Sequence, residues 1–134
     1  MKHSPVIALL AAGLTGCAAD PVQLESEKTY QVEWIGERPL IDNSHLTITL
    51  GEDGRAYGNA GCNHWFASYT REDDKLVFGA AGSTRKLCAP ALMEQEQRFL
   101  AALVTVQRWD VSGIGQLRLW PATGKPIRLW PEEG

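Results

Sequence analysis

Short segments in which apolar and polar residues alternate run through most of this chain, and turn signals separate them. Residues 28–35 (KTYQVEWI) and 46–50 (LTITL) both alternate in this way, which is typical of strands with one buried face. The sequence GEDG at 51–54 is a turn signal, so 46–50 and 55–59 are predicted to form a hairpin. Because the strands are close in sequence and joined by short turns, an antiparallel sheet is expected.

The alternation also predicts which side chains face the core. In the first strand, Tyr30, Val32 and Trp34 share one face, opposite the polar residues. Leu46, Ile48 and Leu50 likewise share a face of the second strand. Further strands are expected at 65–70, 75–79, 107–111, 116–120 and 126–130.

The last two of these strands repeat one motif, LRLWP and IRLWP, on either side of ATGK, which predicts a hairpin. Its two faces are expected to carry Leu117, Leu119, Ile127 and Leu129 on one side and Arg118, Trp120, Arg128 and Trp130 on the other. The second set is open to two interpretations. It is either the less buried face of an ordinary hairpin, with modest cation–π pairs, or a surface that binds a sugar or a peptide.

One segment departs from the alternation. Residues 90–104 (PALMEQEQRFLAALV) place apolar side chains three, four and seven positions apart, which predicts one helix. Pro90 suits the first turn, and Glu94 and Glu96 lie near the positive end of the helix dipole. The two glutamates are two positions apart, so they diverge and do not form an acid–base pair. The predicted apolar face consists of Leu92, Met93, Phe99, Leu100, Leu103 and Val104.

The N-terminus has the build of a secretory signal peptide, because a short basic start precedes a nine-residue apolar run that is too short to span a bilayer. The sequence Leu-Thr-Gly-Cys that ends at Cys17 resembles the lipobox of bacterial lipoproteins, which implies cleavage after residue 16 and lipid on Cys17. An ordinary signal peptide with a chance cysteine is the alternative. Residues 17–27 are expected to be a tether, and 28–131 the folded domain.

The mature chain from Cys17 to Gly134 has the length of one domain. Its formal charge is 12 − 16 = −4, against 13 − 16 = −3 for the whole sequence, because only Lys2 is charged in the first sixteen residues. Charges of both signs are interspersed, so no nucleic-acid partner is expected. An alanine follows Cys17, which favours the periplasmic face of the outer membrane in enterobacteria-like sorting.

Lipidation of Cys17 leaves two cysteines, Cys62 and Cys88, in an oxidising compartment where thiols pair. A disulfide bond between them is predicted, and its loop is worth about 3.5 kcal/mol on the chain-entropy model. Two chemical alternatives exist. In the first, Cys62 is a thiol nucleophile and His64 is its base. In the second, Cys62, His64, Cys88 and His45 bind a metal ion as a Cys2His2 set. Neither C-x2-C nor H-x3-H spacing is present, which argues against structural zinc.

The motif GNAGCNH at 58–64 is therefore interpreted as a structural corner, with no catalytic residue and no metal. Gly58 and Gly61 permit a bulge or a left-handed turn, and the amide of Asn63 can bond to neighbouring backbone. Ser83, Thr84 and Arg85 are expected to supply hydroxyl and guanidinium donors to the same corner.

Two stretches carry a family resemblance: GRAYGNAGCNHWFASYT from residue 54, and LVFGAAGSTRKLCAPALMEQEQRFLAAL from residue 76. With Gly61, Cys62 and Asn63, the Ser-Thr-Arg motif, Cys88 and the Glu-rich helix in order, the chain resembles the META domain family, which includes the heat-shock lipoprotein HslJ. The resemblance implies an α+β fold: a curved, partly open antiparallel barrel-like sheet with one helix packed against it. It also implies an envelope protein associated with stress or drug tolerance, with a fold similar to secretin pilot lipoproteins.

The sequence thus predicts an outer-membrane lipoprotein that is not an enzyme, needs no cofactor and acts by binding. No P-loop, dinucleotide fingerprint or HExxH motif is present. Two other functions stay open: a module that binds a periplasmic protein, as an inhibitor or a secretin pilot does, and a carrier of a small hydrophobic ligand or lipid inside the barrel. The expected binding surface is the Arg and Trp side chains of the last hairpin or the open end of the barrel.

Overall fold

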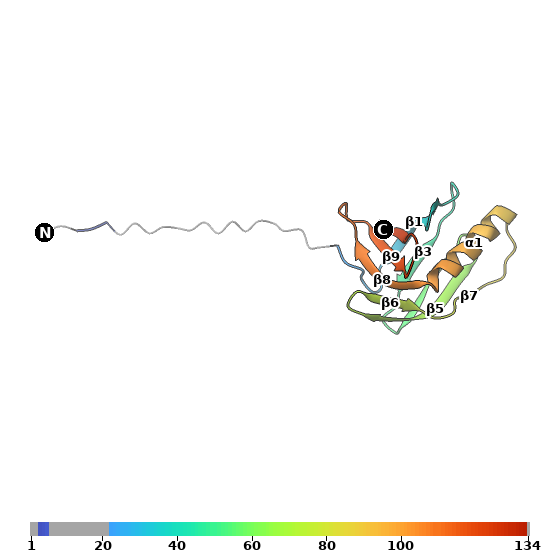
Figure 1. The fold of residues 1–134 in the computed structure, drawn as a ribbon, viewed down its shortest axis with the longest axis horizontal. Coiled ribbons are helices and arrows are strands. Elements are labelled where there is room, and N and C mark those ends of the chain that lie inside the picture. The colour runs from blue at the N-terminus through green and yellow to red at the C-terminus, as the bar shows by residue number, and fades with distance from the viewer. Residues whose placement is uncertain (1–2, 6–21, 134) are drawn as a thin grey trace.

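The computed structural model describes residues 3–5 and 22–133, so the predicted signal peptide apart from residues 3–5, Cys17, and residues 18–21 of the predicted tether lie outside the described residues. Within the described part, the chain forms ten strands and one helix (Figure 1). Their bounds are β1 (Thr29–Ile35), β2 (Arg38–Pro39), β3 (Thr47–Leu50), β4 (Arg55–Asn59), β5 (His64–Glu72), β6 (Lys75–Phe78), β7 (Gly82–Ser83), α1 (Pro90–Leu103), β8 (Val106–Val111), β9 (Leu117–Pro121) and β10 (Ile127–Pro131). The described helix is too short to cross a membrane.

Eight of the strands close into an antiparallel barrel, in the order β10-β9-β8-β6-β5-β4-β3-β1. The ring closes because the C-terminal strand β10 returns to pair with β1, from Tyr30 opposite Pro131 to Ile35 opposite Ile127. β2 and β7 are short additions to β1 and β5. The partly open barrel that the family resemblance implied was wrong, because β10 pairs with β1 and closes the ring.

A β-bulge changes the faces of β1. The register of β1 against β10 shifts between Val32 and Trp34. The extra residue in the bulge reverses the alternation, so each residue after it faces the side opposite to the one that strict alternation predicts. Ile35 is therefore buried, while Trp34 lies opposite Arg128 and is only half-buried. The prediction that Trp34 shares the core face with Tyr30 and Val32 was wrong for this reason.

Side chains fill the barrel interior. Trp65 is the largest fully buried side chain, and its ring meets Phe99 of α1 and Phe78 of β6 edge-on, with ring centroids 5.7 Å and 6.3 Å away. Its indole N–H donates to the backbone oxygen of Thr47, 2.9 Å away. A Cβ on Gly58 would collide with that carbonyl, so a glycine is needed where β4 passes it.

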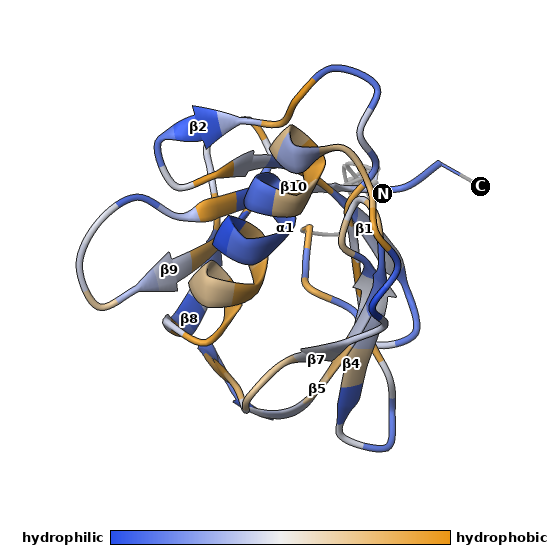
Figure 2. Cartoon of the chain, turned by 90° about the vertical axis from the view of Figure 1, so that its right-hand side faces the viewer, coloured by the Kyte–Doolittle hydropathy of each residue, from blue (hydrophilic) through white to orange (hydrophobic). Residues whose placement is uncertain are grey.

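The helix lies over the strands, with β8 and β9 on one side of it and β4, β5 and β7 on the other (Figure 2). Its observed extent matches the predicted one to within a residue, but its buried side differs. Phe99 and Leu103 are buried as expected, and so are the polar Gln95 and Glu96. Val104, predicted on the apolar face, follows the helix and is exposed.

The two arms of the last hairpin alternate as predicted. Leu117 and Leu119 of β9 and Ile127 and Leu129 of β10 face the core. The Arg and Trp residues between them point outward and are half-buried.

The segment before β1 is attached to the barrel. Leu24, within the predicted tether, is buried in the core. The Tyr30 hydroxyl accepts a hydrogen bond from the Glu25 amide, at 2.8 Å, and donates to the backbone oxygen of Gln23, at 3.1 Å. Burial raises the pKa of Tyr30.

Candidate functional site

The turn between β4 and β5 is fixed by Asn63, which is 3 % exposed. Its Oδ1 accepts hydrogen bonds from the Lys86 amide, at 2.7 Å, and from the Thr84 hydroxyl, at 3.0 Å. Its Nδ2 donates to the Lys86 carbonyl and to Glu96, both at 3.0 Å. The side-chain amide of Asn63 thus makes all four of the hydrogen bonds that an amide offers.

Glu96 joins the same turn to the helix. The carboxylate is 1 % exposed, and its Oε1 accepts from the backbone N–H of Asn63, at 2.7 Å, while Oε2 accepts from the Asn63 side chain. Both donors come from one residue, so the carboxylate holds the backbone and the side chain of Asn63 in a fixed orientation. We call this arrangement of Asn63, Glu96, Thr84 and the Lys86 backbone the Asn63 junction.

The predicted disulfide bond between Cys62 and Cys88 is confirmed, with Cα atoms 6.0 Å apart. It connects the β4–β5 turn to the start of α1, because Cys88 directly precedes Ala89, the N-cap residue of that helix. With both sulfur atoms in this bond, neither is a free thiolate for nucleophilic attack or for metal binding. The cysteines therefore reinforce the contact that Asn63 and Glu96 already make.

Gly61 and Asn59 shape the turn itself. Gly61 has a φ of +106°, which a glycine adopts without strain. Its amide donates to Oδ1 of Asn59, at 2.9 Å, so Asn59 and not Asn63 makes the local bond at the bend. The prediction that Asn63 bonds to neighbouring backbone was wrong in this respect, because its partners lie more than twenty residues away.

The Ser-Thr-Arg motif contributes through two of its residues. Ser83 belongs to β7 and pairs with Trp65, and Thr84 donates to Asn63 and accepts from the His64 amide, at 3.1 Å. Arg85 is exposed and has no hydrogen bond within the described residues. The backbone of the next residue, Lys86, occupies the role that was predicted for the Arg85 side chain.

The two histidines near this turn do not join the cysteines. His64 is exposed at the start of β5, and Nε2 of His45 lies 3.0 Å from Glu132 Oε1. Among residues 3–5 and 22–133, no group of three or more His, Cys, Asp and Glu side chains is placed to hold a metal ion.

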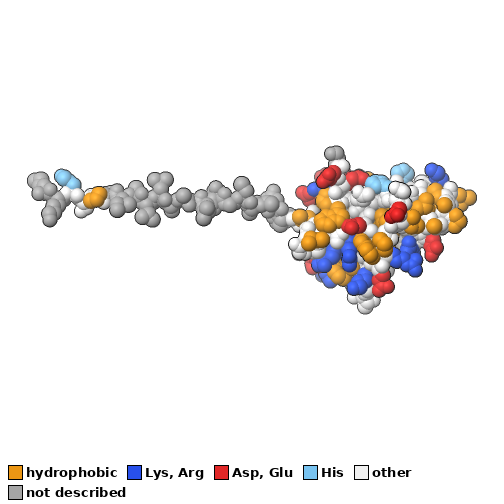
Figure 3. Space-filling model, turned by 90° about the horizontal axis from the view of Figure 1, so that it is seen from above, with side chains coloured by type: hydrophobic (Ala, Val, Ile, Leu, Met, Phe, Trp, Pro, Cys, Tyr) orange, Lys and Arg blue, Asp and Glu red, His pale blue; other side chains and the backbone are white. Residues whose placement is uncertain are grey.

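The residues predicted as a binding surface divide into two clusters. Arg118 lies between Asp110 of β8 and Arg128 of β10 on the outside of the barrel, and Arg128 lies over the ring of Trp34, 5.4 Å from its centroid. The ring of Trp120 has Arg108 and Arg118 against it, at 5.0 Å and 5.2 Å. We call the outer surface formed by Arg108, Arg118, Trp120 and Arg128 the Arg–Trp face. Figure 3 shows one side of the molecule on which Lys and Arg side chains lie next to hydrophobic ones.

Trp130 belongs to the other cluster. Its indole N–H donates to Oε2 of Glu33, which also accepts a hydrogen bond from Gln116 Nε2, at 2.8 Å. Trp130 pairs with Gln31 of β1, toward the other end of the hairpin from Trp120. The structure therefore does not bring Trp120 and Trp130 together.

Among the described residues, Asp110 is the one carboxylate that forms hydrogen bonds with side chains of the Arg–Trp face. It accepts two hydrogen bonds from Arg118 and one from the Trp120 indole, each 2.8 Å long. Burial by itself raises the pKa of Asp110, but the hydrogen bonds from Arg118 and Trp120 and the nearby guanidinium charges outweigh it and lower that pKa. The same bond raises the pKa of Arg118.

A groove that sequence analysis missed lies on the outside of β3, β4 and β5. Tyr57 and Phe66 are directly opposite each other in the β4–β5 pair and are 45 % and 55 % exposed. Thr47 and Thr49 line the groove beside them, and its volume is about 430 Å³. A Cβ on Gly82 would lie 2.5 Å from Phe66 Cε2, so the Phe66 ring rests on Gly82. We call this feature the Tyr57–Phe66 groove.

A family model for the META domain matches residues 22–134 of the chain. The chain belongs to the META domain family. No curated protein matches it.

Two solved structures resemble this META domain. An NMR structure of a protein from Burkholderia xenovorans has a TM-score of 0.70 at 26 % sequence identity, and the match covers 87 % of this chain and 93 % of that one. A second NMR structure has a TM-score of 0.58 at 22 % identity, covering 76 % and 86 % of the two chains, and at that identity it shows the fold alone.

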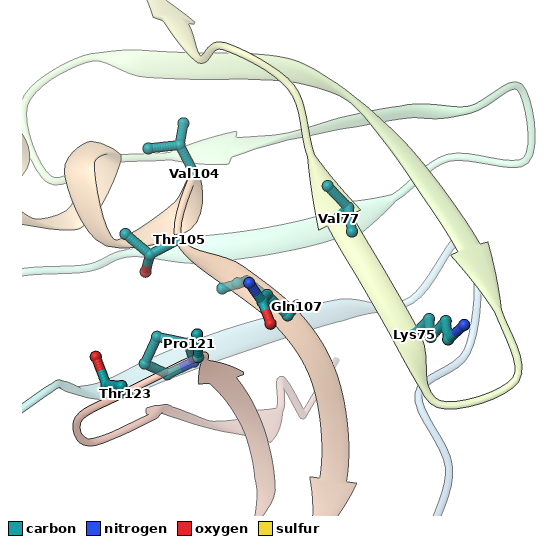
Figure 4. A pocket seen from close by; sticks show the side chains of 9 residues that line it. Lys75, Val77, Val104, Thr105, Gln107, Pro121 and Thr123 are labelled. Carbon is teal, nitrogen blue, oxygen red and sulfur yellow. The ribbon is translucent and has the colours of Figure 1, made fainter.

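The META barrel has its least extensive strand pairing between β6 and β8, which share one residue pair, Lys75 opposite Arg108. Figure 4 shows Val77 and Gln107 on the two strands, with Val104 and Thr105 beside them at the end of α1. The hollow between them has a volume of about 720 Å³. It is mainly apolar because Val77 and Val104 are both exposed into it.

Proposed function

We propose that this META domain protein is a lipid-anchored protein of the bacterial envelope that acts by binding a protein partner and not by catalysis. Lipid on Cys17 would hold it at the periplasmic face of the outer membrane, where it would support tolerance of envelope stress or drugs. The lipobox-like Leu-Thr-Gly-Cys sequence supports the anchor, and the family resemblance supports the role in stress.

The Tyr57–Phe66 groove is the observation that carries the binding proposal. Two aromatic side chains face each other across neighbouring strands and remain about half exposed, although each is large enough to favour burial. Phe66 is held in place by the contact with Gly82, so the partner would meet a pre-formed surface. Exposed aromatic residues beside polar groups are typical of the residues that dominate protein interfaces.

The chemistry of the Asn63 junction supports binding over catalysis. Cys62, Asn63 and their partners use their polar groups for internal hydrogen bonds and a disulfide bond. Catalytic groups need open hydrogen-bonding capacity toward a substrate, which Asn63 does not retain.

A hydrophobic ligand is the second candidate, and the hollow between β6 and β8 is the observation that favours it. The barrel interior is occupied by core side chains such as Trp65, Tyr30 and Phe99, so a carrier would have to use this outer hollow. A native mass spectrum of protein purified without detergent tests this function. A bound ligand that is lost in a Val77→Asp variant would support it, and a spectrum of the bare chain would contradict it.

The mass of the intact protein extracted from membranes tests the anchor. A chain that starts at Cys17 and carries three acyl groups is the expected result, with Cys62 and Cys88 protected from alkylation until reduction. A soluble chain without lipid, or one that begins at another residue, would overturn the lipoprotein proposal.

Photo-crosslinking in cells tests the partner. A photoreactive phenylalanine analogue at position 66 is expected to give one discrete protein adduct. The matched controls carry it at position 77, which is similarly exposed on the neighbouring strand β6, and at position 55 on β4. The same adduct from all three positions, or none from position 66, would contradict binding at the groove.

A further inference from the structure

We propose that the outer surface at the β8–β9 turn and the adjoining β9–β10 hairpin is where the domain rests on an anionic lipid bilayer. This inference builds on the proposed lipid anchor at Cys17 and adds an orientation to it: the Arg–Trp face toward the membrane and the Tyr57–Phe66 groove away from it.

A cationic hollow lies at this surface. It has a volume of about 440 Å³, and Arg118, Lys125 and Arg128 are among the residues that line it, with no carboxylate among them. Arg118 and Arg128 are directly opposite each other on β9 and β10, where like charges repel. Asp110 pairs with Arg118 and Arg108, and neither Lys125 nor Arg128 has an acidic partner among the described residues. A phosphate group bound in the hollow would relieve the repulsion between Arg118 and Arg128 and would pair with Lys125.

An apolar tip borders the same hollow. Ile114, in the β8–β9 turn, is 77 % exposed and lines the hollow together with Trp120. Val22 is also exposed and lies against the same turn, since a Cβ on Gly115 would be 3.6 Å from its Cγ2. An apolar tip beside cationic residues is the arrangement by which peripheral proteins bind the interface of an anionic bilayer.

The position of Val22 brings this corner close to the anchor. Four residues lie between Cys17 and Val22, which makes five steps along the chain. An extended chain spans at most about 3.6 Å per step, or roughly 18 Å here. Lipid on Cys17 would therefore keep the β8–β9 turn within about that distance of the bilayer. β4 and β5 lie on the opposite side of the ring from β9 and β10, so the Tyr57–Phe66 groove would face the periplasm.

Charge complementarity identifies a lipid surface as the occupant. The sequence as a whole has a formal charge of −3, so a basic patch on it is a local feature and not a result of overall composition. The exposed Ile114 needs an apolar medium, which a bilayer provides and a free anion does not.

Vesicle binding tests this orientation without the lipid anchor. The chain from Ala18 to Gly134 contains the entire described core and every described strand and helix, so it is used without lipid. We expect it to sediment with vesicles of equal parts phosphatidylglycerol and phosphatidylcholine, less at high salt, and not with pure phosphatidylcholine. Lys125→Gln and Arg128→Gln are each expected to weaken binding about fivefold. Ile114→Ser is expected to weaken it about tenfold.

Two matched controls separate the docking surface from general charge and hydrophobicity. Arg55→Gln removes an exposed cation from β4, and Leu87→Ser removes an exposed leucine from the segment before α1. Neither is expected to change vesicle binding. Absence of binding to phosphatidylglycerol, or equal losses in test and control variants, would overturn the docking surface. Because the lipid on Cys17 is measured separately by intact mass, the anchor can hold while the docking surface fails.

Discussion

The two parts of the β4–β5 hairpin, its turn and its outer face, have opposite properties. The turn contains Asn63, which is buried and makes every hydrogen bond that its amide offers. The outer face, only a few residues away, exposes Tyr57 and Phe66. A hairpin that is fixed at its turn can therefore present a rigid surface on its strands.

This difference shows that a run of polar residues need not be the functional site. The run of Cys, Asn and His looks chemical in the sequence, yet its side chains mainly hold the sheet to the helix. The plain strand residues Tyr57 and Phe66 carry the better candidate for function. If this division is right, variants in the turn should change stability and variants on the face should change binding.

Removing Glu96 should have the largest effect on stability. Glu96→Ala leaves the buried Asn63 amide N–H without an acceptor and removes two hydrogen bonds to a charged group, so a loss of about 4 kcal/mol is expected. Urea unfolding measures this loss. Glu94→Ala, on the exposed side of the same helix, is the control and should stay within about 0.5 kcal/mol of the parent.

Removing the disulfide bond should have the next largest effect. A Cys62→Ser, Cys88→Ser double variant is expected to lose about 3.5 kcal/mol, because the unfolded chain regains the freedom of the closed loop. The midpoint of thermal unfolding, compared with that of the oxidised parent, measures it, and the reduced parent should unfold close to the double variant. Since Asn63 and Glu96 still join the same elements, the fold should persist at low temperature. Complete loss of native circular dichroism would mean that the hydrogen bonds contribute less than we infer.

Crowding the groove should have a smaller effect on stability. Gly82→Ala places a Cβ about where the Phe66 ring now lies, so the ring must swing away. We expect a loss of about 1 kcal/mol, together with a change in the NMR signals of the Phe66 ring. A photoreactive phenylalanine analogue placed at position 57, opposite Phe66, should also crosslink the partner more weakly in this variant. An unchanged Phe66 ring environment would show that the contact with Gly82 does not fix it.

Neutralising Asp110 should have the smallest effect. Asp110→Asn is expected to cost less than about 1 kcal/mol at neutral pH, because the Asp110–Arg118 pair is partly exposed. Since folding lowers the pKa of Asp110, the stabilisation is present above the ordinary carboxyl pKa of about 4 and is lost as pH falls through the lowered value. The difference between parent and variant, followed by urea unfolding, should therefore shrink in acid. A difference that grows below pH 4 would contradict this sign.

Much of this fold could be predicted from the sequence. Alternation located the strands, apolar spacing located the helix, and the cysteine count with the inferred compartment predicted the disulfide bond. These features depend on local periodicity or on pairing a small number of residues. They do not require knowledge of which distant strands become neighbours.

The remaining features depend on tertiary contacts. Gln95 and Glu96 lie on the buried side of α1, yet a helix pattern that counts apolar residues assigns polar side chains to the surface. Gln95 accepts a hydrogen bond from the Ile41 amide, at 2.8 Å, across a distance of 54 residues in sequence. The bulge after Val32 and the pairing of β1 with β10 likewise leave no local signal. The five consecutive polar residues at 94–98 span more than one helical turn, so some of them must face the core, and this is the signal that would have pointed to the junction.

The unfolding free energies of Asn63→Ala and Phe66→Ser, measured side by side in urea, test the division between turn and face most directly. The account predicts a loss of about 3 kcal/mol or more for Asn63→Ala, because the Lys86 amide and the Glu96 carboxylate lose buried partners. It predicts a loss of about 1 kcal/mol or less for Phe66→Ser, since most of that ring is already exposed. Equal losses, or a larger loss for Phe66→Ser, would contradict the account.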